Sequence, residues 1–193
     1  LTTENLYFTE ASRITDNEGN TTLVMRLNTN IEDCYMDFVY TLPSDDYMVR
    51  MSIQTNNMQL VLAQNMASLE MQWNQLIPQQ EKGRKFEEKY AQLQYMFVGG
   101  DIEKLSEVKA DRKKESSRIK WIGYKDQFFS TVLISEDGFE SSQMESTPQN
   151  VKSHYIKEYK TTTSVPFDIT GKKTTDLKYY FGPNHYNTLK AYD

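Results

Sequence analysis

The chain has 193 residues, of which 38% are hydrophobic and 12% aromatic, and 22 basic and 27 acidic residues give it a net charge of -5. This length fits one large domain or two small ones. The acidic balance argues against nucleic-acid binding, because binding to phosphates needs a positive face. No run approaches ~18 apolar residues, so the sequence predicts no membrane-spanning segment and no signal peptide. Cys34 is the single cysteine, which excludes an intrachain disulfide and gives no information about the compartment.

In the first half of the chain, apolar and polar residues alternate with a period of two. This pattern predicts antiparallel strands with one buried and one solvated face. The predicted strands lie at 23–27, 34–42, 47–54, 69–74 and 93–97. Between the last two, the pairs Glu81–Lys85 and Phe86–Tyr90 are spaced i,i+4, which predicts a short surface helix within 79–90.

The second half begins with the most charged stretch, 101–120, which predicts a solvated loop or hairpin tip, with a partner-binding site as the alternative. Residues 121–134 carry apolar side chains on both faces, which predicts a central strand with Trp121 in the core. Further strands are expected at 155–161, 165–169 and 177–181, and then a helix with Asn184 as its N-cap. Ten or more short strands at this spacing predict an all-β sandwich, with residues 1–193 as one domain.

No set of residues predicts catalysis, a cofactor or a metal. His154 and His185 lie far apart and outside any zinc motif, and Cys34 falls on the apolar face of its strand. Asp45–Asp46 follow a proline and indicate a turn rather than a calcium site. Glu87–Glu88 and Glu136–Asp137 are expected to be exposed acids. Trp73 and Trp121 could stack on sugar rings, although alternation within strands favours a core position for both.

Three stretches resemble the periplasmic domain of the YidC family of bacterial membrane protein insertases (YidC/Oxa/Alb). They are YTLPSDDYMV at 40–49, IKWIGYKDQFF at 119–129 and YFGPNHYNTL at 180–189. The first resembles paired strands joined at a Leu-Pro turn, and the second the signature strand in which an aromatic run follows a Trp. The third is similar to the closing Gly-Pro strand and the helix after it. The composition of the chain, rich in Tyr, Lys, Asn and Met, resembles that of Bacteroidetes members of the family.

This resemblance implies a β-supersandwich like that of galactose mutarotases, located in the periplasm as part of a longer, multi-pass inner-membrane protein. The family inserts and folds membrane proteins, alone or with the Sec translocon. The family's insertion groove lies among membrane helices outside this chain, so the resemblance carries no catalytic, cofactor or metal residue over to it. Sec components and nascent membrane proteins are the implied partners, and a scaffold or chaperone-like contact role is the implied function.

Two charged or terminal segments are the candidate contact surfaces on this interpretation. The candidate partner-contact residues are Arg112, Lys113, Lys114, Tyr186, Leu189 and Lys190. A secreted carbohydrate-binding or carbohydrate-active supersandwich protein is the alternative. It requires a cleft with exposed Trp or Tyr and a converging carboxylate and His, and the sequence shows no such set. A cell-surface lipoprotein is a third possibility.

Overall fold

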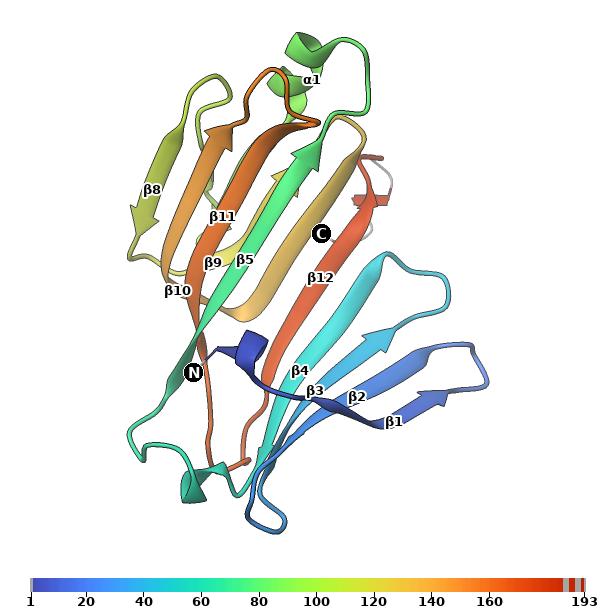
Figure 1. Cartoon of the computed structure of the whole chain (residues 1–193), viewed down its shortest axis with the longest axis vertical. Helices are drawn as coiled ribbons and strands as arrows, with labels where there is room; N and C mark the ends of the chain where they lie inside the picture. Colours follow the sequence, from blue (N-terminus) through green and yellow to red (C-terminus); the bar gives the residue numbers. More distant parts are fainter. Residues whose placement is uncertain (1, 186–187, 190–191, 193) are drawn as a thin grey trace. The chain divides into compact units, whose positions relative to one another are not determined.

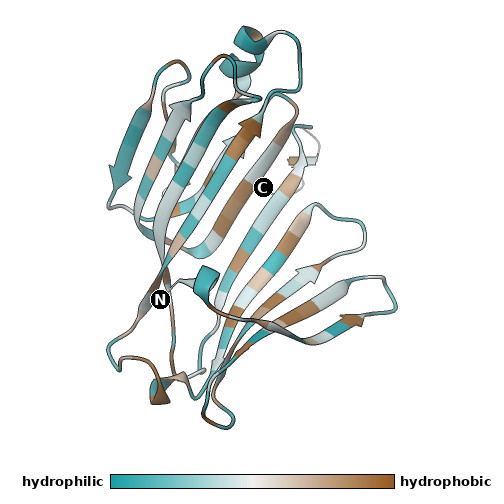
Figure 2. Ribbon diagram, viewed as in Figure 1, coloured by the Kyte–Doolittle hydropathy of each residue, from teal (hydrophilic) through white to brown (hydrophobic). Residues whose placement is uncertain are grey.

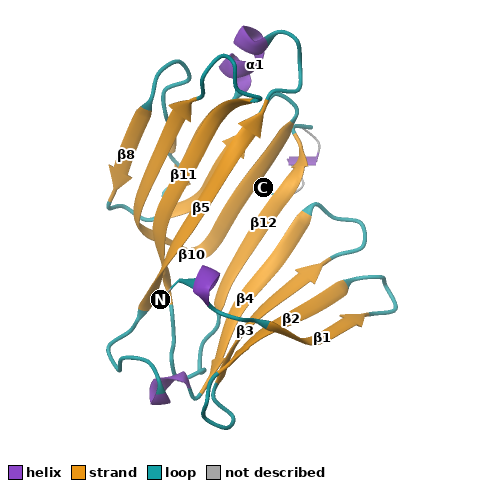
Figure 3. Cartoon of the chain, viewed as in Figure 1, coloured by secondary structure: helices purple, strands orange, loops and turns teal. Residues whose placement is uncertain are grey.

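The computed structural model describes residues 2–185, 188–189 and 192, and antiparallel strands make up most of this part of the chain (Figures 1 and 3). It divides into two compact units. Unit 1 comprises Leu1–Leu69 and Val165–Tyr179, and unit 2 comprises Glu70–Ser164 and Tyr180–Asp193. The all-β prediction is therefore confirmed. The supersandwich arrangement and the single-domain assignment stay predictions.

Unit 1 is an antiparallel sheet in the order β1-β2-β3-β4-β12. Its strands are β1 (Thr9–Thr15), β2 (Thr21–Asn28), β3 (Tyr35–Leu42), β4 (Met48–Asn56) and the first part of β12 (Thr175–Pro183). Two short 3-10 helices, η1 (Thr3–Asn5) and η2 (Met58–Leu60), lie outside the sheet. The strands predicted at 23–27, 34–42 and 47–54 are confirmed as β2, β3 and β4. Their alternation of polar and apolar residues fits a sheet with one covered face.

Unit 1 has a small, methionine-rich set of buried residues. Its buried residues include Cys34, Met36, Met48, Met51, Ile53, Met58, Phe167, Ile169 and Leu177. The loop after β11 packs tightly here, where Thr55 Oγ1 donates to the Asp168 carbonyl at 2.6 Å. Gly171 has a φ of 75°, and a Cβ there would lie 2.3 Å from the Thr55 carbonyl oxygen. Only glycine fits this position without strain.

Unit 2 has two sheet layers, one in the order β10-β9-β6-β7 and the other in the order β8-β10-β11-β5. The strands are β5 (Ser68–Pro78), β6 (Gln92–Phe97), β7 (Ile102–Lys104), β8 (Asp111–Glu115), β9 (Ile119–Lys125), β10 (Phe129–Pro148) and β11 (Tyr155–Pro166). The helix α1 (Arg84–Tyr90) connects β5 to β6. β10 belongs to both layers: its first part pairs with β9 and its second part with β8 and β11. Gly138 and Ser141, with φ of 81° and 51°, lie where it passes between them.

Aromatic side chains join the two layers of unit 2. The Tyr124 ring on β9 stacks on Trp73 of β5 with centroids 4.0 Å apart, and it contacts the Tyr159 ring of β11 in a tilted arrangement at 5.1 Å. The Tyr124 hydroxyl contacts the Trp73 carbonyl at 2.9 Å and the Thr161 hydroxyl at 2.6 Å. Burial raises the pKa of Tyr124 and Tyr159. Trp73 is therefore half-buried against the core, as the core interpretation predicted.

Two sequence predictions for unit 2 were wrong. Residues 121–134 form no single strand buried on both faces, because β9 ends at Lys125 and β10 begins at Phe129, which is 52% exposed. Trp121 is only half-buried, since the inner face of β9 is occupied by Ile122 and Tyr124. The charged stretch 101–120 is not a loop: it contains β7, β8 and the start of β9.

The end of the chain matches its predictions in part. The strands expected at 155–161 and 177–181 are confirmed as β11 and β12, whereas 165–169 is the end of β11 and a loop. The Leu189 amide donates to the His185 carbonyl at 3.0 Å, a helical i,i+4 bond. The Asn184 side chain donates to the Asp126 carbonyl and accepts from the Ser130 hydroxyl. The amides of residues 186 and 187, which an Asn184 N-cap would bind, lie outside the described residues, so the N-cap stays a prediction. Tyr186 and Lys190 lie outside the described residues.

Candidate functional site: the α1 tip of unit 2

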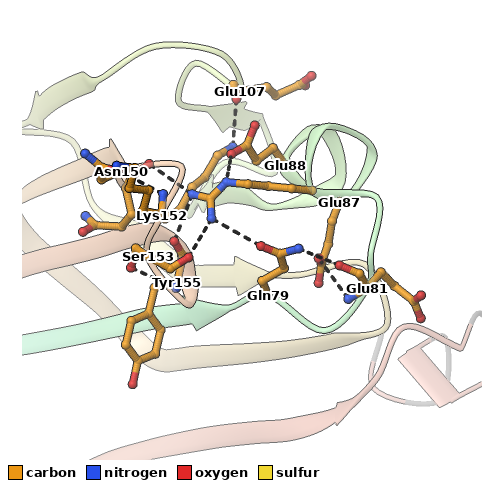
Figure 4. A network of polar contacts seen from close by, with 12 residues as sticks. Gln79, Glu81, Glu87, Glu88, Glu107, Asn150, Lys152, Ser153 and Tyr155 are labelled. Atoms are coloured by element: carbon orange, nitrogen blue, oxygen red, sulfur yellow. Dashed lines mark hydrogen bonds and ion pairs between the residues drawn. The ribbon is translucent and has the colours of Figure 1, made fainter.

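One end of unit 2 is formed by α1 and two loops, and we call residues 79–91, 105–110 and 149–155 the α1 tip (Figure 1). Arg84, the first residue of α1, connects these segments. Its Nη1 and Nη2 groups donate to the carbonyls of Ser153 (2.9 Å), Gln149 (3.0 Å) and Tyr155 (3.0 Å). Nη1 also donates to Gln79 Oε1 at 3.4 Å, and Nε pairs with Glu88 at 2.8 Å (Figure 4). All five guanidinium N–H groups are therefore used.

Glu87 binds the turn that precedes α1. Its carboxylate accepts from the main-chain amides of Gln80 at 2.8 Å and Glu81 at 3.3 Å, so it holds the turn that leads into the helix. The residue is buried, with 1% exposure. The sequence prediction of an exposed Glu87–Glu88 pair was therefore wrong for Glu87. A carboxylate can be buried here because two amide donors replace its water.

Lys157 of β11 lies under the tip with 1% exposure. Its Nζ donates to the Ala91 carbonyl, which ends α1, and to the Glu107 carbonyl at 2.8 Å. Burial lowers the pKa of Lys157 to about 8, against the opposing effect of Glu107 and Glu88. A neutral amine still has two N–H groups, so both carbonyls keep a donor in either protonation state. Lys157 therefore fixes the loop at 105–110 to the end of α1.

The solvent side of the tip carries apolar residues and lysines together. Val108 is 86% exposed, Val151 77%, Phe86 55% and Tyr90 42%. The exposed lysines beside them are Lys82, Lys85, Lys89, Lys109 and Lys152. None of these five lysines forms an ion pair with any residue that the structure describes. The tip is thus rigid beneath and both apolar and positive on its surface.

The two outer strands of the β8-β10-β11-β5 layer differ in chemistry. β8 is hydrophilic along its whole length (Figure 2) and carries Arg112, Lys113 and Lys114. β5 has eleven residues and a single charge, Glu70, and in the described structure it pairs with β11 alone. Charged side chains protect a sheet edge from pairing with other chains. The β5 edge lacks this protection.

The predicted contact residues on β8 are engaged within unit 2. Arg112 pairs with Glu145 at 3.1 Å, and Lys113 pairs with Glu103 at 2.9 Å above the Tyr95 ring. Lys114 is exposed. Leu189, the one described member of the terminal set, is 38% exposed. A partner role for Leu189 or for β8 stays a prediction.

The residues judged structural from sequence occupy structural positions. Cys34 is buried beside Met58, with the two sulfur atoms 3.9 Å apart. Asp46 Oδ1 accepts from the Met48 amide at 3.0 Å, as a turn residue does, and His154 is exposed. In the described part of the chain, no group of three or more His, Cys, Asp or Glu side chains is placed to hold a metal. No helix in that part is long and apolar enough to cross a membrane.

Sequence reasoning missed the three residues that build the tip. Lys157 was detectable, because alternation along β11 places it on the same face as Tyr159, Thr161 and Thr163, all of which are buried. Arg84 and Glu87 gave no such signal, since most of their partners are main-chain groups, up to 71 residues away in the chain. Main-chain partners leave no pattern in side-chain types.

Comparison with known proteins identifies the family. The model of the YidC periplasmic domain matches residues 1–193. The chain belongs to the YidC periplasmic domain family. It is 48% identical over its whole length to the membrane protein insertase YidC of Parabacteroides distasonis and 41% identical to that of Bacteroides fragilis. It covers 30% of each of these proteins.

The match confirms the resemblance seen in the sequence, including its Bacteroidetes character. The named relatives are insertases and carry no enzyme name, in agreement with the expectation that this domain is not an enzyme. Among solved structures, a TPR-domain containing protein from Parabacteroides distasonis aligns with 92% of the chain and 34% of its own length. The TM-score is 0.47 at 6% identity, too low to define a shared fold.

Proposed function

We propose that this chain is the periplasmic contact module of a membrane protein insertase, which inserts and folds inner-membrane proteins alone or with the Sec translocon. In this role it performs no chemistry. It is a scaffold that binds Sec components or emerging segments of nascent membrane proteins. The observation that carries the proposal is the match of the whole chain to the YidC periplasmic domain family, whose relatives are named insertases.

The β5 edge supports a contact with extended chain segments. An unpaired strand edge offers free main-chain N–H and C=O groups, to which an extended peptide can add as a further strand. β5 supplies eleven residues for such pairing. Its exposed side chains Gln72, Asn74 and Leu76 leave the edge without charge beyond Glu70. We propose that emerging segments of nascent membrane proteins bind β5 in this way while they are still extended.

Photo-crosslinking in cells tests this proposal in the full-length protein that contains the chain. A photoreactive residue at Asn74 is expected to crosslink to nascent membrane proteins or Sec components, and one at Lys172, on an exposed loop of unit 1, is not. The double variant Asn74→Lys/Leu76→Lys charges the β5 edge. It should abolish the crosslinks made from a photoreactive residue at Gln72, which is exposed on the same face of β5. The matched control Ser12→Lys, on the β1 edge, should leave them unchanged.

Two outcomes would contradict the proposal. Equal crosslinking from Asn74 and Lys172 would show that the β5 edge is no specific contact. Normal growth of cells that contain the insertase without this domain, with normal levels of its inserted substrates, would remove the contact role altogether.

A further inference from the structure

We propose that the α1 tip of unit 2 docks on the surface of a bilayer that contains anionic lipid. This inference goes beyond the insertase assignment, because it concerns a surface of the chain itself and can be tested without any insertase activity. It rests on the chemistry of the tip, the rigidity of its base and the place where the last strand ends.

The charge of the tip is opposite to that of the chain. The chain has a net charge of -5, yet the tip exposes Lys82, Lys85, Lys89, Lys109 and Lys152, with Glu81 as its one fully exposed acid. Glu88 is paired with Arg84, and Glu107 with Lys104. Each lysine near an anionic membrane surface contributes about 1 kcal/mol of attraction. The tip is therefore a local positive surface on an acidic molecule.

The apolar residues of the tip lie beside these lysines in sequence. Lys85 precedes Phe86, Lys89 precedes Tyr90, and Val108 and Val151 are each followed by a lysine. Surfaces that bind at a membrane interface usually combine two kinds of residue. Their aromatic and aliphatic side chains enter the headgroup region, and flanking lysines reach the lipid phosphates. The Phe86 and Tyr90 rings contact each other, with centroids 4.9 Å apart, so they present one aromatic surface on α1.

The base of the tip holds these segments in place before any contact is made. Arg84 fixes α1 to the loop at 149–155, and Lys157 fixes the end of α1 to the loop at 105–110. Docking then requires little ordering of the loops, which otherwise costs free energy on binding. The Lys157 side chain is buried and the Arg84 side chain is 12% exposed, so both hold the base of the tip instead of forming its outer surface.

Strand β12 ends at this same end of unit 2. The Asn184 amide, just after β12, donates to the Phe128 carbonyl at 2.7 Å, and the Asn184 side chain donates to the Asp126 carbonyl at 3.0 Å. Asp126 in turn accepts from Gln80, within the tip, at 3.5 Å. A tip that rests on the bilayer therefore places the end of β12 near the membrane surface.

Vesicle sedimentation of the 193-residue chain tests the proposal. We expect binding to vesicles with roughly 30 mol% phosphatidylglycerol in phosphatidylcholine, loss of binding as salt rises, and little binding to phosphatidylcholine alone. The triple variant Lys82→Gln/Lys85→Gln/Lys89→Gln should lower the partition coefficient roughly a hundredfold. The matched control Lys120→Gln/Lys172→Gln/Lys173→Gln removes the same charge elsewhere and should change it by less than about threefold.

The apolar part of the surface is tested separately. Val108→Ser/Val151→Ser changes only exposed loop residues and should weaken binding several-fold with an unchanged denaturation midpoint. The control Ile14→Ser removes an exposed aliphatic residue of β1 and should have no effect on binding. Absence of binding to anionic vesicles, or equal losses in the tip and control variants, would overturn the proposal. Binding of a Sec protein to the tip without any binding to vesicles would assign the surface to a protein partner instead.

Discussion

Units 1 and 2 both consist of antiparallel strands, yet they bury their side chains differently. Unit 1 has a single sheet with methionine side chains on one face, where Met51 is 9% exposed and Met36 8%. In unit 2 two layers enclose aromatic and branched residues, and Phe139, Tyr159 and Leu133 are all 0% exposed. When two sheets pack together, the side chains between them are shielded from water completely. Side chains on the covered face of a single sheet stay partly open to water at its edges. The same alternating sequence pattern therefore accompanies two different degrees of burial.

The largest difference should appear in core truncations. Phe139→Ala in unit 2 is expected to lower the free energy of unfolding by about 3–5 kcal/mol, because it leaves an aromatic-sized cavity between two layers. Met51→Ala in unit 1 should cost about 2 kcal/mol, since its site is already near solvent and can relax. Urea denaturation of both variants measures this. A Met51→Ala cost equal to that of Phe139→Ala would show that unit 1 is as tightly packed as unit 2.

The α1 tip is held by polar contacts instead of apolar packing, and Arg84→Ala tests their weight. We expect a loss of roughly 2–4 kcal/mol, because four acceptors at the tip lose their charged donor and Glu88 loses its ion pair. Hydrogen exchange should rise within 79–91 and 149–155 and stay unchanged in unit 1. Arg84→Lys keeps the charge without the five donors and should give an intermediate loss. A full rescue by lysine would show that charge, and not the network, holds the tip.

In unit 1 the tightest constraint is a backbone contact. Gly171→Ala places a methyl group 2.3 Å from the Thr55 carbonyl oxygen at a positive φ, and we expect a loss of about 2–3 kcal/mol. Gly99→Ala is the matched control, since a Cβ there meets nothing within 4 Å. Thermal or urea unfolding compares the two. Equal stability of the two variants would mean that the loop at 168–173 moves away from β4 without cost.

Lys157 should make the free energy of unfolding depend on pH. Its folded pKa of about 8 lies below the usual 10.5, so between these values the unfolded chain binds more protons than the folded one. The free energy of unfolding of the wild type should then rise relative to Lys157→Met as pH rises from 8 toward 9.5, by at most about 1.4 kcal/mol per pH unit. Above pH 10 the buried tyrosines act in the opposite direction in both proteins. A constant difference between the two proteins from pH 7 to 9.5 would place the Lys157 titration outside this window.

Sequence reasoning found β2, β3 and β4 of unit 1, because alternation and turn residues are local signals, but it did not predict β1. It found the family from the resemblance of three short stretches. It failed for residues whose structural role depends on their position in the folded chain. Asp111–Glu115 looks like a solvated loop, but it is an outer strand whose charges protect the sheet edge. Arg84 and Glu87 looked like ordinary helix-surface residues, although main-chain carbonyls and amides surround them. The α1 tip could not be predicted, because three segments distant in sequence create it.

Trp121 shows the same limit in a single residue and gives the smallest expected effect. Apolar residues on both faces of 121–134 predicted a core tryptophan, with a loss of roughly 3–5 kcal/mol on truncation. In the structure Trp121 lies on the face of β9 opposite Tyr124, half-buried, with its ring beside Gly123. We now expect about 1 kcal/mol for Trp121→Ala, since the site stays open to water. Ile122→Ala, one residue along on the inner face, should cost about 2–4 kcal/mol in the same urea titration. If the order of the two losses were reversed, the outer face of β9 would have to be covered in solution by another part of the protein or by a partner.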